Sequence, residues 1–284
     1  MTEARAPAAG DVAEESGYLA SGGGSIYCTL FRRSRDVAGA PGLCAVLLGA
    51  FAEERKSSTR PLVEIARALA SGGVPCARVD FRGCGDASGR SVEISLPGMI
   101  EDAVAAASGV AAELSCARVA LCGLRLGGSV ALLASPALKG TLGACVMIEP
   151  VVKGESYVRE LTRKQAIRKM MTKGSAKGDE EGAGDVFDLD GIELARSFVD
   201  EMGGIDLVES ARGPARGVPV AAIVQVGART SPTRDNAALA GALGARLEVV
   251  RIEPFWLQTE RVDVGPVASV VGDVLAEAGR DGGA

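Results

Sequence analysis

The sequence feature that most constrains this chain is a strand, a tight turn and a helix in direct succession at residues 118–133. Residues 119–122 are apolar, Gly123 and Gly127 flank Arg125, and residues 130–133 are again apolar. An abrupt turn between a buried strand and a buried helix presents its central side chain at the edge of a sheet, where a serine would serve as a nucleophile. Arginine stays protonated in proteins and only donates hydrogen bonds, so Arg125 cannot take that role. We therefore expect a turn that keeps its shape and lacks a nucleophile.

The chain contains no histidine in its 284 residues. Serine nucleophiles, and most cysteine nucleophiles, are activated by an adjacent base, which is most often histidine. A Ser-His-Asp or Cys-His arrangement therefore cannot be assembled within this chain. We expect whatever the protein does to proceed without a catalytic triad.

Apolar runs alternate with helical patterns along most of the chain. We predict strands at residues 25–31, 43–49, 74–81, 144–148, 220–226 and 247–252, and helices at residues 61–70, 99–114, 234–243 and 264–278. Hydrophobic residues make up 47% of the chain and aromatic residues only 4%, which is typical of parallel strands covered by helices. The pattern predicts an α/β fold with a mostly parallel central sheet and helices on both faces. We expect the loops after Gly49, Asp80, Gly123 and Ile148 to share the edge where such sheets bind ligands.

The alternation is interrupted between residues 153 and 211. The pattern predicts a basic helix at residues 157–172, a mobile linker rich in glycine and acids at residues 174–184, and a further helix at residues 188–202. We interpret residues 153–211 as a helical cap inserted into a core of residues 17–152 and 212–284. The alternative is that these residues form a solvent-exposed surface segment that does not cover the sheet edge. Residues 1–16 contain acids and no apolar segment, so we predict a disordered tail there and not a signal peptide.

Composition narrows the classes of partner. The net charge of −5, without a basic stripe that carries aromatic residues, argues against nucleic-acid binding and leaves small molecules or proteins as the expected partners. No apolar run is long enough to span a membrane. Seven cysteines without a CxxC pair indicate buried thiols in a reducing compartment, so we expect a cytoplasmic protein with no metal site and no cofactor.

Several short strings resemble a known superfamily in their order and context. They are Phe51-Ala52-Glu53-Glu54, Asp80-Phe81-Arg82-Gly83-Cys84-Gly85-Asp86, Gly123-Leu124-Arg125-Leu126-Gly127, Glu149-Pro150-Val151, Asp190-Gly191 and Pro254-Phe255-Trp256. The chain resembles the α/β-hydrolase superfamily on its serine-aminopeptidase-like side, and most closely the exosortase-A-associated hydrolase 2 group. The genes of that group accompany bacterial exosortase and exopolysaccharide systems. The resemblance implies an α/β-hydrolase fold and a role in a biosynthetic pathway of that kind.

When the catalytic positions of the superfamily are placed on this sequence residue by residue, none of them holds the expected triad member apart from a possible acid. The serine position is Arg125, and the histidine position is Phe255 or Trp256. The acid position falls near residues 229–235, where Asp235 is the only carboxylate. The group itself carries Gly-Leu-Arg-Leu-Gly at the turn, so the missing nucleophile is characteristic of the group. The word hydrolase in its name then rests on the fold and not on chemistry.

The turn could still bind a ligand. If the backbone keeps its shape, the amide of Leu126 and an amide at Ala50 or Phe51 point into the former oxyanion site, beside a helix N-terminus that attracts anions. Arg125 adds a fixed positive charge that suits carboxylate or phosphate. Trp256 could line this pocket or fill the core.

Structural roles are the alternative for the same residues. A salt bridge from Arg125 to Glu53, Glu54 or Asp86 would fix the loops to one another. One of the two glutamates could instead be a perturbed general base. Cys84, between two glycines, is the one thiol whose position would suit a nucleophile.

Two classes of function therefore stay open. In the first, a catalytically silent hydrolase fold binds a small anionic, acyl or glycosyl ligand, or a partner biosynthetic enzyme. In the second, a lyase, transferase, cyclase or atypical hydrolase uses Glu54, Asp86 and Arg125 as base and electrostatic stabiliser. A pocket packed with side chains would favour the first class, and an open apolar cavity with an acid facing Arg125 would favour the second.

Overall fold

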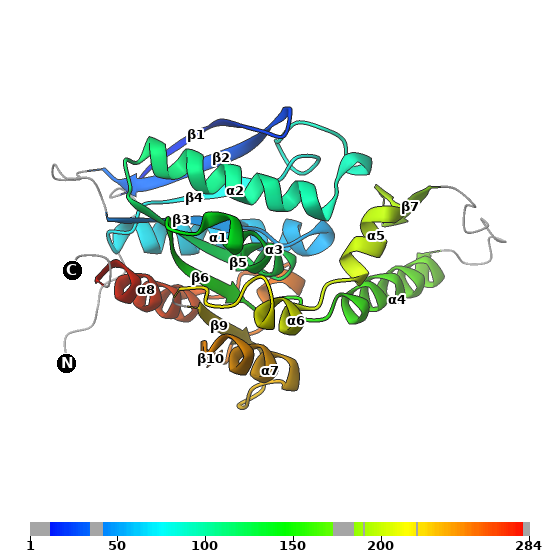
Figure 1. Ribbon diagram of the computed structural model, residues 1–284. Coiled ribbons are helices and arrows are strands. Elements are labelled where there is room, and N and C mark those ends of the chain that lie inside the picture. Colours follow the sequence, from blue (N-terminus) through cyan, green and yellow to red (C-terminus); the bar gives the residue numbers. More distant parts are fainter. Residues whose placement is uncertain (1–11, 35–41, 173–184, 190, 220, 281–284) are drawn as a thin grey trace.

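A central sheet of eight strands organises the computed structural model, which describes residues 12–34, 42–172, 185–189, 191–219 and 221–280 (Figure 1). The strand order is β1-β2-β4-β3-β5-β6-β9-β10. The strands are β1 (Val12–Ser21), β2 (Gly24–Arg33), β3 (Leu43–Leu48), β4 (Cys76–Asp80), β5 (Arg118–Leu124), β6 (Leu142–Ile148), β9 (Ala221–Val226) and β10 (Arg246–Val250). β1 and β2 pair antiparallel with each other, and β2 pairs antiparallel with β4. All other pairs are parallel, as the sequence predicts.

Helices cover both faces of the sheet, which confirms the predicted architecture. One face packs against α1 (Ala52–Ser71) and α8 (Gly265–Arg280), and the other against α2 (Leu96–Glu113), α3 (Leu126–Ala134) and α7 (Arg234–Leu243). In β3, Cys44 and Val46 point into one apolar cluster, while Ala45 and Leu47 point into the other. A strand that is buried on both faces needs apolar residues at every position, which explains the continuous run in this segment.

The N-terminal part of the chain differs from the sequence prediction. The disordered tail predicted for residues 1–16 is wrong from Val12 onward, because β1 begins there and pairs with β2 along its whole length. Residues 1–11 lie outside the described part of the chain. The acids of β1 misled the prediction: β1 is an edge strand, and Glu14 and Glu15 are exposed there. Polar side chains are common on such strands.

Helix α1 also starts earlier than predicted. It begins at Ala52, whereas the sequence placed its start at Pro61, which lies in the helix interior. Proline is favoured at the first position of a helix, and that preference misled the prediction. The correction moves Glu53 and Glu54 from a loop into the first helical turn.

The part of the chain between β6 and β9, hereafter the inserted segment, contains both helices and strands. Its elements are α4 (Gly154–Thr172), β7 (Val186–Leu189), β8 (Ile192–Ala195), α5 (Arg196–Gly203) and α6 (Leu207–Arg212). The predicted basic helix is confirmed and begins three residues earlier, at Gly154. The helix predicted for residues 188–202 is wrong in its first half, because an antiparallel hairpin precedes α5. The linker predicted at residues 174–184 lies outside the described residues.

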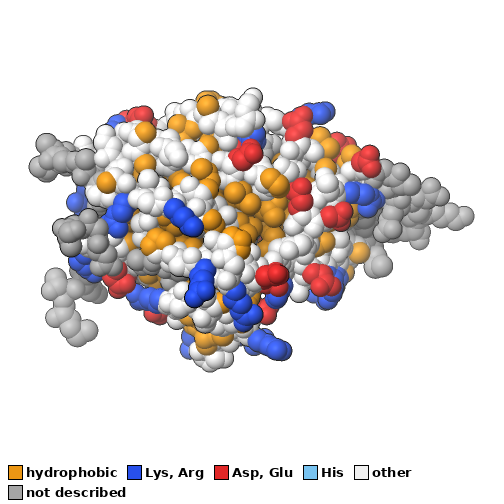
Figure 2. Space-filling view, in the orientation of Figure 1, with side chains coloured by type: hydrophobic (Ala, Val, Ile, Leu, Met, Phe, Trp, Pro, Cys, Tyr) orange, Lys and Arg blue, Asp and Glu red, His pale blue; other side chains and the backbone are white. Residues whose placement is uncertain are grey.

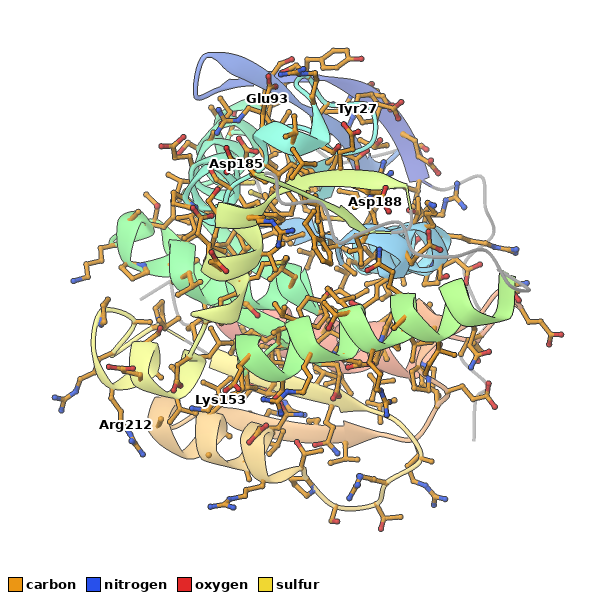
Figure 3. The ribbon with its side chains drawn as sticks, turned by 90° about the vertical axis from the view of Figure 1, so that its right-hand side faces the viewer. Tyr27, Glu93, Lys153, Asp185, Asp188 and Arg212 are labelled. Carbon is orange, nitrogen blue, oxygen red and sulfur yellow. The ribbon has the colours of Figure 1, made fainter. Side chains whose placement is uncertain are left out.

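In Figure 1, α4, α5 and β7 of the inserted segment lie beside the sheet at the right, and α6 lies nearer the centre. Figure 3 views this side directly: α4 runs across the front from near Lys153, and the hairpin with Asp185 and Asp188 lies above it. No helix among the described residues is both long and apolar enough to cross a membrane. On the face drawn in Figure 2, acidic and basic side chains are interspersed around a central group of apolar ones.

Candidate functional site

The turn between β5 and α3 has the sharp geometry that the sequence predicts. Arg125 adopts φ 54° and ψ −120°, a conformation that is rare for residues other than glycine. A Cβ on Gly127 would lie 2.4 Å from the carbonyl oxygens of Leu48 and Gly49, and one on Gly123 would lie 2.1 Å from the carbonyl oxygen of Gly127. The flanking glycines are therefore required because the backbones of β3, β5 and α3 touch. Strain at a single residue that its surroundings enforce is typical of functional turns.

Arg125 forms a buried ion pair with Glu54. Its Nη2 lies 3.1 Å from Oε1 of Glu54, and its Nε lies 3.2 Å from both carboxylate oxygens. The two side chains are only 12% and 5% exposed. Burial, the largest single effect, acts to lower the pKa of Arg125, but the charge and hydrogen bonds of Glu54, together with Tyr157 and Glu149, raise it overall. The pair is thus a charge-assisted contact that neutralises Arg125 at the apex of the turn.

The other two carboxylates proposed as partners lie elsewhere. Glu53 points away from the turn and forms an ion pair with Lys56 at 2.6 Å. Asp86 is exposed in the loop after β4, and its backbone N–H donates to Asp80. Among the three acids that the sequence offered, only Glu54 reaches Arg125.

Two aromatic rings enclose the ion pair. The guanidinium carbon of Arg125 lies 5.5 Å from the ring centre of Tyr157 and 5.3 Å from that of Trp256. These distances suit cation–π contacts, which gain strength where water is excluded. The Tyr157 hydroxyl donates to Oε2 of Glu54 at 3.1 Å. Burial raises the pKa of Tyr157 well above its usual range, so the hydroxyl keeps its proton and remains a donor.

Sequence reasoning missed Tyr157 and Glu149. Glu149 follows β6 directly, adopts φ 42°, and accepts a hydrogen bond from the Val226 amide at 2.8 Å through Oε2. Its carbonyl oxygen accepts from Nη1 of Arg125 at 3.3 Å. Burial raises the pKa of its carboxyl group, against the lowering effects of that amide and of Arg125. The signal for Glu149 was an acid directly at a strand end, whereas no local pattern marks Tyr157.

The cavity beside Arg125 is small and is not lined by the residues whose amides were expected to bind a ligand, Ala50, Phe51 and Leu126. Its volume is about 210 Å³. Its lining consists of Arg125, Glu149, Pro150, Val151, Val152, Lys153, Ser156, Tyr157, Glu160, Thr233, Asp235 and Asn236. The expected ligand-binding residues Ala50, Phe51, Leu126 and Trp256 are all buried and outside this lining. Within the described chain, the Leu126 amide donates to no protein acceptor.

None of the three remaining candidate positions presents a reactive group to the Arg125 turn. Asp235 is exposed in the first turn of α7, at the rim of the cavity. Cys84 is half-buried, and burial raises the pKa of its thiol to about 12, which opposes nucleophilic reactivity at neutral pH. Phe255 and Trp256, at the histidine position, pack edge to face and fill the core beside α1 and α8.

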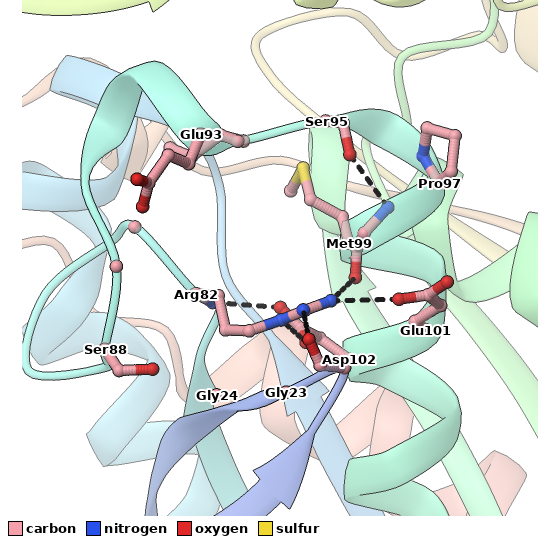
Figure 4. Close-up of a pocket in the computed structure, with 15 residues that line it drawn as sticks. Gly23, Gly24, Arg82, Ser88, Glu93, Ser95, Pro97, Met99, Glu101 and Asp102 are labelled. Carbon is pink, nitrogen blue, oxygen red and sulfur yellow. Dashed lines mark hydrogen bonds and ion pairs between the residues drawn. The ribbon is translucent and has the colours of Figure 1, made fainter.

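A larger cavity lies away from Arg125 (Figure 4). It measures about 540 Å³, between the β1–β2 turn, the loop after β4 and the start of α2. Arg82 joins these walls: its Nε donates to Asp102 at 2.6 Å, and its Nη1 donates to the carbonyl oxygen of Gly22 at 2.8 Å. Its Nη2 donates to the carbonyl oxygen of Gly98 and to Glu101, so all three nitrogens of Arg82 bind within the protein and we assign it a structural role.

Comparison with solved structures identifies the fold. Est1E from Butyrivibrio proteoclasticus, in a structure with bound ferulic acid, superimposes with a TM-score of 0.67 over 92% of this chain and 98% of its own, at 17% sequence identity. The chain has the α/β-hydrolase fold. A proline iminopeptidase from Mycobacterium smegmatis matches with a TM-score of 0.63 at 12% identity, over 94% of this chain and 99% of its own. The Pyrococcus furiosus esterase matches with a TM-score of 0.61 at 14% identity, over 93% and 91%.

Sequence comparison adds nothing to this assignment. No family model matches the chain, and no curated protein is significantly similar to it. At these levels of identity the superpositions show a shared fold and not a shared activity.

Proposed function

We propose that this protein has an α/β-hydrolase fold without hydrolase chemistry and binds a ligand or a partner beside the turn that carries Arg125. The observation that supports this most directly is Arg125 at the apex of the turn, paired with Glu54 and enclosed by Tyr157 and Trp256. At the position where a hydrolase of this fold would carry its nucleophile, this chain has an arginine whose charge is neutralised by Glu54. With no histidine in the chain, the side chain that most often activates a hydroxyl or thiol is absent.

The geometry favours a small acyl or glycosyl ligand over a fully anionic one. Glu54 already balances the charge of Arg125, and the cavity lining adds three acids, Glu149, Glu160 and Asp235, against Lys153. Arginine has five N–H groups. Contacts to Glu54 and the Glu149 carbonyl engage Nε and one N–H on each terminal nitrogen of Arg125, so within the described chain two N–H groups stay available for a carbonyl or hydroxyl oxygen.

The biological setting is part of the same proposal. The resemblance to the exosortase-A-associated hydrolase 2 group supports a bacterial exopolysaccharide-type pathway, with a partner biosynthetic enzyme as the alternative occupant. We also propose that the inserted segment acts as a cap, because its α4 supplies Tyr157 to the ion pair and Ser156 to the cavity wall. A cytoplasmic location stays a prediction.

A non-triad enzyme is the second candidate, because Glu54 does face Arg125. Two features weigh against it. Asp86, one of its three proposed residues, is exposed in a different loop. Glu54 accepts hydrogen bonds from both Arg125 and Tyr157, so its oxygens are engaged and not poised to take a proton from a substrate.

Ester hydrolysis and fluorophosphonate labelling test the absence of hydrolase chemistry. We expect no labelling and no turnover of p-nitrophenyl acetate or of acyl thioesters above that of a heat-denatured sample. Robust turnover that a single Ser→Ala or Cys84→Ala change abolishes would overturn the proposal.

Ligand binding is tested at the cavity itself. Calorimetry with methyl glucoside, hexanoyl amide and glucose 1-phosphate compares the neutral ligands with an anionic one. Ser156→Trp, at an exposed lining position, should abolish binding, whereas Glu155→Trp, exposed on the same helix outside the lining, should leave it intact. Binding that survives Ser156→Trp would place the ligand elsewhere.

A further inference from the structure

The cavity beside Arg125 has no spare positive charge in its lining. The lining contains two basic residues, and both already have acidic partners. Arg125 is paired with Glu54. Lys153 forms an ion pair with Asp206. Any acid of the lining that lacks a partner of its own therefore leaves the cavity with an excess of negative charge.

Two of the three acids in the lining are in that position. Glu160 forms an ion pair with Lys164 at 2.6 Å. Glu149 uses one carboxylate oxygen, Oε2, to accept from the Val226 amide, and its Oε1 accepts no hydrogen bond from the described residues. Asp235 is exposed in the first turn of α7 and forms no ion pair within the described chain. Glu149 and Asp235 therefore supply the excess negative charge.

Asn236 adds a third acceptor to the same cavity. The Thr233 backbone N–H donates to Oε1 of Gln225 at 2.6 Å, so this oxygen, and not the amide nitrogen, faces the start of α7. Asn236 donates to the same oxygen through Nδ2 at 3.1 Å, and its own Oδ1 therefore points away. That oxygen receives no donor from the described part of the chain, although the side chain is only 2% exposed. A buried acceptor without a donor is costly, and Asn236 lines the cavity.

The three acceptors are held close to one another. The Val226 amide holds Glu149 at the end of β9. Gln225, the preceding residue of β9, holds Asn236. Asp235 is the neighbour of Asn236 in the first turn of α7. A ligand in a cavity of about 210 Å³ therefore meets all three.

A protonated primary amine matches this set of acceptors. It carries one positive charge and three N–H donors and has no acceptor of its own. A hydroxyl group offers a single donor and no charge, so it leaves two of the three acceptors unsatisfied. Burial raises the pKa of Glu149, which means that its negative charge is costly in this position. A cation beside the carboxylate would offset that cost.

We propose that the ligand of this cavity carries a primary ammonium group, which binds to Glu149, Asp235 and Asn236. The inference rests on the proposed function and narrows its ligand class to amino sugars and to acyl groups that bear an amine. The two available N–H groups of Arg125 then bind a carbonyl or hydroxyl oxygen of the same molecule. Glu149 and Asp235 are thereby the residues that determine which ligands are accepted.

Calorimetry at neutral pH with two matched pairs of ligands tests the proposal. Glucosamine is compared with glucose, and 6-aminohexanamide with hexanamide, so that the members of each pair differ at the amino group. We expect each amine to bind about 10- to 100-fold more tightly than its neutral counterpart, because hydrogen bonds to charged groups are stronger than neutral ones.

The Ser156→Trp variant, which fills the cavity, separates failure of this inference from failure of the proposed function. Equal affinities within each pair, with binding still abolished by Ser156→Trp, would overturn the ammonium group and leave the ligand site in place. Binding that survives Ser156→Trp, or no binding of any of the four ligands at millimolar concentration, would overturn this inference together with the small-molecule form of the proposed function.

Charge-neutral variants locate the ammonium group. Glu149→Gln keeps an acceptor for the Val226 amide and should reduce the preference for the amine about tenfold. Asp235→Asn should reduce it by a smaller factor, because this carboxylate is exposed. Glu155→Gln removes an exposed charge on α4 outside the lining and should leave the preference unchanged. Circular dichroism verifies that each variant is folded. A preference that survives the double change Glu149→Gln and Asp235→Asn would overturn the proposal.

Discussion

The arginine at the apex of the β5–α3 turn carries a charge that the surrounding side chains must neutralise. Arg125 cannot leave the turn, because its backbone is fixed between two glycines that touch neighbouring strands. An unpaired guanidinium in this position would carry a large desolvation cost. Glu54, the Glu149 carbonyl and two aromatic rings together remove that cost. Arg125 is therefore a fixed part of the core.

Breaking the Arg125–Glu54 pair should destabilise the protein more than breaking an exposed pair. We expect Arg125→Met to lower the free energy of unfolding by about 3 to 5 kcal/mol, because it leaves Glu54 buried without its partner. Arg60→Met, which removes a largely exposed pair with Glu64, should cost about 0 to 1 kcal/mol. Urea unfolding of both variants measures the difference. Equal losses would mean that Arg125 is solvated and that its pairing is incidental.

Glu149 should make stability fall as the pH rises. Its pKa in the folded state is raised above the ordinary 4.5, so the folded protein binds a proton more tightly than the unfolded chain. This contribution is fully present below pH 4.5 and is lost as the pH rises through the folded-state pKa. In Glu149→Gln, which retains an acceptor for the Val226 amide, we expect the decline over that window to be smaller. Thermal melting across that pH window tests this, and an unchanged or steeper decline would contradict it.

At the scale of elements, the rotation of α1 about its axis decides which acid reaches Arg125. Consecutive helical residues differ by about 100° around the axis, so neighbouring side chains point to different sides. Glu54 shares the buried side of α1 with Ser58, Leu62 and Ile65, whereas Glu53 is turned outward. Because α1 begins at Ala52, Glu53 and Glu54 are both helical, and only Glu54 lies on the side that faces Arg125.

The close packing of α3 on β3 makes Gly127 indispensable. In Gly127→Ala the new Cβ would meet backbone carbonyls of Leu48 and Gly49, which cannot rotate away, so we expect a loss of about 3 kcal/mol or more. Gly241→Ala is the matched change, because it lies exposed inside α7 with open space around it. Alanine there should stabilise by about 0.5 to 1 kcal/mol. A tolerated Gly127→Ala, measured by chemical unfolding, would show that the turn relaxes.

At the scale of the whole molecule, the inserted segment completes the site from outside the sheet. Tyr157 enters on α4, and Phe198 of α5 packs edge to face on Phe51, with ring centres 5.3 Å apart. These contacts join the inserted segment to the loop after β3 and to the start of α1. The ion pair is therefore enclosed only when the inserted segment is docked.

Hydrogen exchange should separate the inserted segment from the sheet. β5 is paired on both sides, with β3 and β6, whereas β7 and β8 pair only with each other. Two-stranded hairpins are marginally stable on their own, so we expect the amides of β7 and β8 to exchange about 100-fold faster than those of β5. β9, which is also paired on both sides, is the control for strand identity. Equal protection would show that the inserted segment unfolds only together with the sheet.

The sequence by itself determined the fold class, the turn and the absence of histidine. Apolar runs and helical periods are local signals that follow from burial on one or both faces, so they predicted the parallel sheet and its covering helices. The glycines around Arg125 and the lack of histidine are visible in the sequence itself. The edge strand at Val12 and the hairpin at residues 186–195 were missed, since their polar residues obscure strand periodicity.

Only the tertiary structure decided what neutralises Arg125. Glu53, Glu54 and Asp86 are equivalent in sequence, and the choice depends on the rotation of α1 and on the direction of the loop after β4. Tyr157 reaches Glu54 across more than one hundred positions of chain, through a helix whose own sequence pattern predicts only a basic surface. Contacts between segments this far apart arise from the packing of whole elements, and no local pattern encodes them.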